Sequence, residues 1–290
     1  DHIDKDTLEI DMINFSGPNF KEVDNRLMSL QLIKNDMTDA VMFGPDGNNL
    51  LPAAVLYKKN ILALRGSFRP VTKVNLDMFE KSYDIFIRDK GVDQNNTIVI
   101  FEITLSNLKA SGEIDEQDFM DRAELLCSLG HSVMISKFQE YYKLVEYFNN
   151  YTKNRIGLTM GVNNLVDIFD EKYYRHLSGG ILEAFGKLFF KDLQVYLYPM
   201  KNPDTGQIMT SNNVKVHPRM KELYKFFKYN GKVMDIIVYE PDVMHIFSRD
   251  VLKKLMNNED GWEEMLPEGI AEIIKQKQLF TRKTEDQEAE

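Results

Sequence analysis

The chain has 290 residues, of which 43% are hydrophobic and 28% charged, and its formal net charge is −9 at pH 7. This acidic excess repels the phosphates of nucleic acids, so we expect no nucleic-acid partner. No apolar run reaches the ~18 to 20 residues that a membrane-spanning helix needs, so we expect a soluble protein without a membrane partner.

The single cysteine, Cys127, excludes an intrachain disulfide and a zinc cluster built on cysteines. It lies in a helical pattern of apolar residues, which predicts a buried structural thiol. A chain with one cysteine fits the cytoplasm or another reducing compartment.

Strand and helix patterns alternate along most of the chain. Strand patterns cover residues 10–15, 40–43, 61–64, 97–104, 132–136, 156–160 and 193–198. Helical patterns cover residues 23–34, 76–88, 116–129, 139–151, 165–174 and 180–190. Alternation at this spacing predicts a Rossmann-like α/β fold, in which helices cover both faces of a mainly parallel sheet. We expect the strand at 61–64 to be central and parallel to its successors at 98–103 and 132–136.

Three parts of the chain are expected from these patterns. Residues 1–59 either add strands at the edge of the same sheet or form the tail of a preceding domain, and residues 60–233 form the Rossmann-like domain. The turn-rich residues 202–206 predict a hairpin or a loop tip within it. Residues 234–290 form a helical C-terminal section that ends in a frayed acidic tail from residue 281.

The most informative stretch is residues 60–78, in which an apolar strand runs through Gly66 and a short loop into a helical segment. Such a unit places backbone N–H groups where a phosphate can bind. Arg65, Arg69 and Lys73 bring three positive charges to this loop. We expect at least two of them to project into a cleft at the carboxyl edge of the sheet and to bind an anion there.

This loop resembles the first motif of the nucleotidyltransferases that transfer an adenylyl group to nicotinate mononucleotide or phosphopantetheine. That motif reads Gly-Ser/Thr-Phe-x-Pro-x-Thr/His-x-x-His. The matching positions are Gly66, Ser67, Phe68, Pro70 and Thr72, whereas Asn75 replaces the closing His. The resemblance implies that Thr72 donates a hydrogen bond to a phosphate and that Asn75 occupies a catalytic position. Asparagine can donate there but carries no charge, and losing one transition-state donor typically costs ~10² to 10³ in rate.

A second motif of these enzymes, Ile-Ser-Ser/Thr-x-x-Arg, has a partial counterpart at residues 246–251. The resemblance implies that Ser248 caps a helix and that Arg249 reaches a phosphate. The alternative is an ordinary helix start with an exposed arginine.

Residues 10–18, 23–31, 65–72, 179–183 and 247–252 resemble an uncharacterised family of bacterial proteins. Its members carry the names nicotinate-nucleotide adenylyltransferase or "TonB-dependent receptor". They are longer at the N-terminus, so this chain resembles their C-terminal part, and the N-terminal half or another subunit is the implied partner.

The resemblance implies a nucleotide- or phosphate-binding protein in which adenylyl transfer is impaired or lost. ATP and Mg²⁺ would be the cofactors of any remaining transfer. The alternative is a non-catalytic assembly subunit that kept the fold.

Acidic residues between positions 113 and 121 open a helical pattern, where the helix dipole favours carboxylates, so we predict no metal site there. Glu102 lies near the carboxyl end of a presumed central strand, where open α/β sheets bind ligands. A salt bridge or a cap is the alternative role for Glu102.

Overall fold

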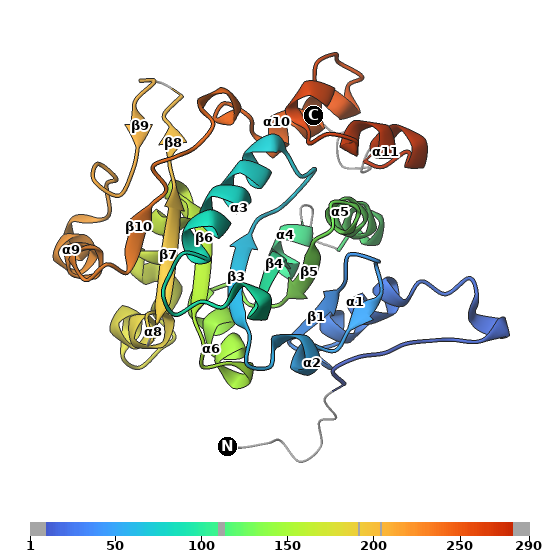
Figure 1. The fold of residues 1–290 in the computed structure, drawn as a ribbon, viewed down its shortest axis with the longest axis horizontal. Coiled ribbons are helices and arrows are strands. Elements are labelled where there is room, and N and C mark those ends of the chain that lie inside the picture. The colour runs from blue at the N-terminus through green and yellow to red at the C-terminus, as the bar shows by residue number, and fades with distance from the viewer. Residues whose placement is uncertain (1–9, 110–113, 191, 204, 281–290) are drawn as a thin grey trace.

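The computed structural model describes residues 10–109, 114–190, 192–203 and 205–280 (Figure 1). At its centre lies an eight-stranded sheet with the strand order β10-β7-β6-β3-β4-β5-β1-β2. These strands are β1 (Ala40–Phe43), β2 (Asn49–Leu50), β3 (Asn60–Arg65), β4 (Thr97–Thr104), β5 (Ser132–Ser136), β6 (Ile156–Gly161), β7 (Leu193–Tyr198) and β10 (Val233–Asp235). The central position of β3 and its parallel alignment with β4 and β5 are confirmed.

The order of the strands reverses once, at the middle of the sheet. From β3 the chain moves outward through β4 to β5 and then returns to the other side of β3 for β6, β7 and β10. The six strands β3, β4, β5, β6, β7 and β10 run parallel to one another. In this sheet β1 pairs antiparallel with β5, and β2 pairs antiparallel with β1. In such a sheet the crevice between the carboxyl ends of β3 and β6 is the topological switch point, where ligands bind.

Helices cover both faces of the sheet, as the sequence predicts. They are α1 (Asn25–Lys34), α2 (Pro52–Leu56), α3 (Lys73–Phe86), α4 (Leu105–Leu108), α5 (Glu116–Ser128), α6 (Tyr141–Tyr151), α7 (Val162–Ile168), α8 (Gly180–Leu188), α9 (Lys221–Tyr229), α10 (Ser248–Met256) and α11 (Ile270–Lys277). Short 3₁₀ helices lie at Pro18–Phe20, Gln94–Asn96, Glu171–Tyr174, Pro218–Met220, Pro241–Val243 and Glu263–Met265. A small hairpin of β8 (Met200–Lys201) and β9 (Ile208–Met209) confirms the predicted hairpin.

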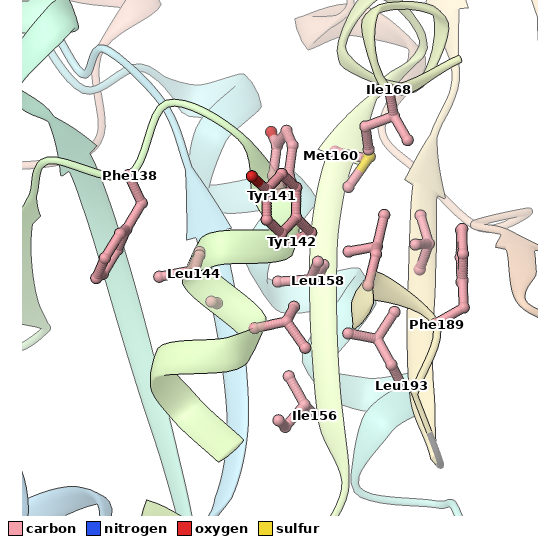
Figure 2. Close-up of a cluster of buried hydrophobic side chains, with 14 of the residues drawn as sticks. Phe138, Tyr141, Tyr142, Leu144, Ile156, Leu158, Met160, Ile168, Phe189 and Leu193 are labelled. Atoms are coloured by element: carbon pink, nitrogen blue, oxygen red, sulfur yellow. The ribbon is translucent and has the colours of Figure 1, made fainter. Parts of the chain in front are cut away.

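The alternation of side chains along β3 explains the two layers of core. Ile61 and Ala63 face the cluster that contains α6, α7 and α8, whereas Leu64 faces the cluster that contains α5 and the C-terminal helices. Figure 2 shows part of the first cluster, to which α6 contributes Leu144 and β6 contributes Leu158. Full burial of each such side chain stabilises the fold by roughly 1.5–3 kcal/mol.

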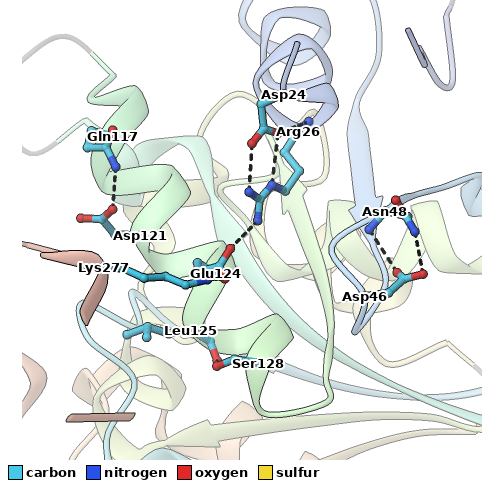
Figure 3. Close-up of polar contacts among 10 residues, drawn as sticks. All are labelled: Asp24, Arg26, Asp46, Asn48, Gln117, Asp121, Glu124, Leu125, Ser128 and Lys277. Carbon is cyan, nitrogen blue, oxygen red and sulfur yellow. Dashed lines mark hydrogen bonds and ion pairs between the residues drawn. The ribbon is translucent and has the colours of Figure 1, made fainter. Parts of the chain in front are cut away.

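Charged residues join three helices on the second face. Arg26 of α1 donates to Asp24 and to Glu124 of α5, with both ion-pair distances at 2.9 Å (Figure 3). Lys277 of α11 also pairs with Glu124. The Phe280 N–H donates to a carboxylate oxygen of Asp121 at 2.6 Å, so the C-terminal section is fixed to α5.

Several sequence predictions need correction. Residues 10–15 form no strand, because the backbone of Phe15 bonds to the side chain of Asn25 instead of to a neighbouring strand. The predicted helix 165–174 is split into α7 and a 3₁₀ helix. Cys127 is buried as expected, and burial raises the pKa of its thiol to about 11. Glu113 and residues 281–290 lie outside the described residues.

No helix among the described residues combines the length and the apolar composition that crossing a membrane requires.

Candidate functional site

A cavity of about 740 Å³ lies at the carboxyl ends of the central strands. Its wall includes Gly66 after β3, Thr104 at the end of β4, Gly161 at the end of β6 and Tyr198 at the end of β7. It therefore lies at the topological switch point, and its size falls in the range of small-molecule and cofactor sites.

Four further elements contribute to the wall of this carboxyl-edge cavity. Asn75 and Met78 of α3 form one side, and the first turn of α6 with α7 forms another. Met244, Ile246 and Phe247, from the segment before α10, close the top with apolar side chains. The wall thus combines apolar side chains with polar ones that can bond to a ligand.

Arg65 forms a buried ion pair at the base of this cavity. The register of β3 and β4 places it opposite Glu102, and its guanidinium donates to both carboxylate oxygens at 2.5 and 2.9 Å. The side chains of Arg65 and Glu102 are 8% and 0% exposed. Burial alone lowers the pKa of Arg65, but attraction by Glu102 raises it overall, so the guanidinium stays charged and its charge is matched.

Neighbouring groups fix this pair in place. The Arg65 Nη1 donates to the carbonyl oxygen of Gln139 at 2.8 Å, and the guanidinium lies 4.4 Å from the centre of the Tyr141 ring. The Ser136 hydroxyl donates to Glu102 at 2.5 Å. The salt-bridge role considered for Glu102 is therefore the observed one.

Thr72 and Asn75 cap the start of α3. The N–H and the hydroxyl of Thr72 both donate to the Asn75 Oδ1, at 2.9 and 3.0 Å. A backbone N–H can only donate, so this contact fixes which end of the amide is oxygen. Thr72 is 0% exposed and does not line the cavity, whereas Asn75 does. The asparagine that replaces the motif histidine thus holds the helix N-terminus.

The loop between β3 and α3 is shaped by Phe68. This residue has a φ of 47°, is 1% exposed and packs 5.3 Å from the ring of Phe101. A Cβ at Gly66 would lie 2.9 Å from the Phe68 ring, so the close approach requires glycine. Pro70 is buried in the same loop.

Arg122 of α5 holds this loop in place, and neither sequence motif includes this residue. Its Nη1 donates to the carbonyl oxygens of Ser67 and Asn107 at 3.0 Å each, and it is 1% exposed. It also pairs with Asp118. The sequence signal is a cation placed among apolar residues of a helical pattern.

The other predicted cations do not reach the cavity. Arg69 pairs with Asp118 at 2.5 Å and lines a separate cavity of about 160 Å³. Lys73 is exposed and is absent from the wall. The expectation that two of the three loop cations share one cleft is therefore wrong, because Asp118 attracts Arg69 to the other side of the loop.

The second motif also lies outside the wall. Ser248 is the first residue of α10, and the Arg249 side chain is 82% exposed. Phe247, not Arg249, contributes to the cavity. The arrangement is that of a helix start with an exposed arginine.

Sequence analysis misses the polar groups that follow β5 and β6. Tyr141 and Asn164 line the cavity, and Tyr141 is 8% exposed. The Tyr141 hydroxyl lies beside Asn164, yet no hydrogen bond of ordinary length and angle joins it to a described residue. Burial raises the pKa of Tyr141 to about 12, so the group is a neutral phenol with a hydrogen available to a ligand.

The fold and the cavity define an α/β protein with a cavity at the switch point of a doubly wound sheet. No protein-family model matches the chain, and no curated protein matches it.

Similar solved structures include two of the Plasmodium falciparum nicotinic acid mononucleotide adenylyltransferase. The complex with NaAD has a TM-score of 0.43 at 13% identity, and the complex with APC has a TM-score of 0.43 at 14% identity. Both alignments cover 77% of this chain and 97% of the other. A putative nicotinate-nucleotide adenylyltransferase from Vibrio parahaemolyticus has a TM-score of 0.33 at 11% identity, with 78% and 97% covered. These likenesses concern the fold alone.

Proposed function

We propose that this protein binds a nucleoside or nucleotide in the carboxyl-edge cavity and is related to the nicotinate-nucleotide adenylyltransferases but does not transfer an adenylyl group. The observation that supports this most is the place of the cavity, between the carboxyl ends of β3 and β6. Its apolar residues would contact a flat base, and its amide and hydroxyl groups would bond to base edges and sugar hydroxyls.

The loss of transfer rests on the groups near Asn75. Adenylyl transfer from ATP with Mg²⁺ needs cations at the phosphates, since positioning and charge stabilisation supply most of the catalysis. Among the described residues of the wall, Arg65 is the only Lys or Arg, and Glu102 matches its charge. Asn75 is neutral, and Thr72 occupies its oxygen.

The test is thermal unfolding with a panel of nucleosides, with a cavity-filling variant beside it. Gly161 lines the cavity, and a Cβ built there meets no atom within 4 Å. Gly161→Leu therefore places a side chain in the ligand space. We expect at least one nucleoside to raise the melting temperature of the wild type. At a ligand concentration of ~100 times Kd, binding stabilises the folded state by ~2.7 kcal/mol. Gly161→Leu should show no such rise.

Gly186→Leu is the matched control, because Gly186 also has no atom within 4 Å of a built Cβ but lies exposed on α8. It should keep the full ligand shift. Equal shifts in both variants would place the ligand elsewhere, and no shift with any nucleoside or nucleotide would remove the proposed function.

The second candidate is an assembly subunit, and one surface favours it. Ile237 and Val238 follow the outermost strand β10 and are 82% and 67% exposed, and Met234 within β10 is 41% exposed. Exposed aliphatic residues beside an unpaired sheet edge are typical of a contact surface. Sedimentation at increasing protein concentration tests this candidate, since Ile237→Lys should remove any association seen for the wild type.

A further inference from the structure

The charges around the carboxyl-edge cavity do not suit a polyphosphate. The charged side chains of its wall, among the described residues, are Arg65, Glu140 and Asp167. Glu102 already neutralises Arg65 through two hydrogen bonds. The remaining formal charges are two carboxylates, which repel phosphate groups.

These two carboxylates differ in their surroundings. Glu140 precedes α6 and pairs with Lys143, whose Nζ lies 2.8 Å from the Glu140 Oε2. Asp167 of α7 makes no ion pair with any described residue, and its charge raises the pKa of Tyr141 in addition to the larger effect of burial. Asp167 is exposed, and it is therefore the carboxylate of the wall whose charge no described residue pairs.

The neutral polar groups provide what an uncharged ligand needs. Tyr141 is more than nine-tenths buried, lines the cavity and has no hydrogen-bond partner of ordinary geometry among the described residues. Asn164 and Asn75 are further neutral residues on the same wall. A buried hydroxyl without a partner costs free energy unless a ligand bonds to it.

We infer that the cavity takes an unphosphorylated nucleoside in preference to its phosphates, and that Asp167 is the residue that rejects the phosphate groups. This inference rests on the proposed function, because it specifies the ligand class of the same cavity. A carboxylate can also accept hydrogen bonds from sugar hydroxyls, so the same residue that repels phosphate is compatible with a ribose.

The test is calorimetric titration with a nucleoside, its 5′-monophosphate and its 5′-triphosphate. Adenosine, guanosine, cytidine and uridine series are compared at fixed ionic strength in a buffer that contains a chelator and no Mg²⁺. For the base that binds, the triphosphate should bind ~10-fold or more weakly than the nucleoside. Asp167→Asn should narrow this ratio ~3-fold or more, because loss of the negative charge favours the triphosphate more than the uncharged nucleoside.

Asp84→Asn is the matched control. Asp84 lies exposed on α3, makes no ion pair with a described residue and does not line the cavity. It changes the net charge by the same amount and should leave the ratio unchanged.

The outcomes separate this inference from the function on which it rests. A triphosphate that binds as tightly as the nucleoside or more tightly would overturn the inference and leave the proposed function standing. If the ratio of triphosphate to nucleoside Kd is unchanged in Asp167→Asn, or changes equally in Asp84→Asn, then Asp167 does not select against phosphate groups. If no nucleoside or nucleotide binds, both the inference and the proposed function are wrong.

Discussion

Replacing Glu102 with Gln tests the buried ion pair at the base of the cavity. The amide keeps the size of the carboxylate, and its oxygen can still accept from Ser136. Its NH₂ group cannot accept from Arg65, however, so a buried guanidinium loses its counter-charge and at least one of two hydrogen bonds. Breaking a buried pair in this way costs about 3 to 5 kcal/mol of unfolding free energy.

The large loss of unfolding free energy expected for Glu102→Gln is due to the burial of the ion pair, so a solvent-exposed ion pair serves as the control. Glu222 and Lys225 of α9 pair at 2.7 Å, but their side chains are 79% and 41% exposed. Water screens this exposed pair, so Glu222→Gln should change the unfolding free energy far less than Glu102→Gln. Urea unfolding of both variants, followed by circular dichroism with the slope of each transition compared, measures the difference.

A double variant separates charge from packing. Arg65→Met combined with Glu102→Leu removes both charges, and such apolar replacements are often close to neutral. Here the buried Ser136 hydroxyl loses its acceptor, which leaves a residual cost of about 1 to 3 kcal/mol. The reasoning is refuted if Glu102→Gln costs no more than Glu222→Gln, or if the double variant is less stable than Glu102→Gln.

Three further predictions concern the cap of α3, the half-buried His131 and the Cys127 thiol. Thr72→Ala and Asn75→Ala should each cost ~1 kcal/mol in urea unfolding, and the double variant should cost less than their sum because they share one cap; full additivity would contradict this. Burial lowers the pKa of His131 from 6.5 to about 4, so between these pH values the folded state keeps the ring neutral whereas the unfolded chain binds a proton there. Its contribution to stability should be lost as the pH falls from 6.5 towards 4, and His131→Phe should have a flatter stability profile in that window, whereas identical profiles would exclude the effect. Cys127 is 5% exposed and should react with a thiol reagent at pH 8 only on the timescale of unfolding; rapid labelling of the folded chain would contradict its burial.

The strands of the central sheet could be predicted because the hydrophobic pattern of each strand is visible in its own residues. Residues 98–101 are apolar on both faces, as a strand covered by helices on both sides requires, and β4 takes the predicted bounds 97–104. The antiparallel placement of β1 next to β5 was not predictable in this way. That pairing depends on contacts between segments about ninety residues apart, such as Val41 with Ile135.

The candidate site was only partly predictable for the same reason. Gly66 and Asn75 do line the cavity, and the spacing from Thr72 to Asn75 is that of a helix cap. The partners of Arg65 and Arg69 lie 37 and 49 residues away. A positive charge in a sequence motif does not reveal whether a distant carboxylate neutralises it. The residues next to Arg69 in the sequence therefore could not show that Asp118 would pair with it.

The measurement that tests the central claim most directly is a crystal structure of the protein with the nucleoside that binds most tightly. Our account predicts the ligand between the carboxyl ends of β3 and β6, with hydrogen bonds to Tyr141 and Asn164 and with Asp167 facing its sugar. A ligand seated against Arg69 in the smaller cavity, or a phosphate bound at Arg65 in place of Glu102, would contradict it.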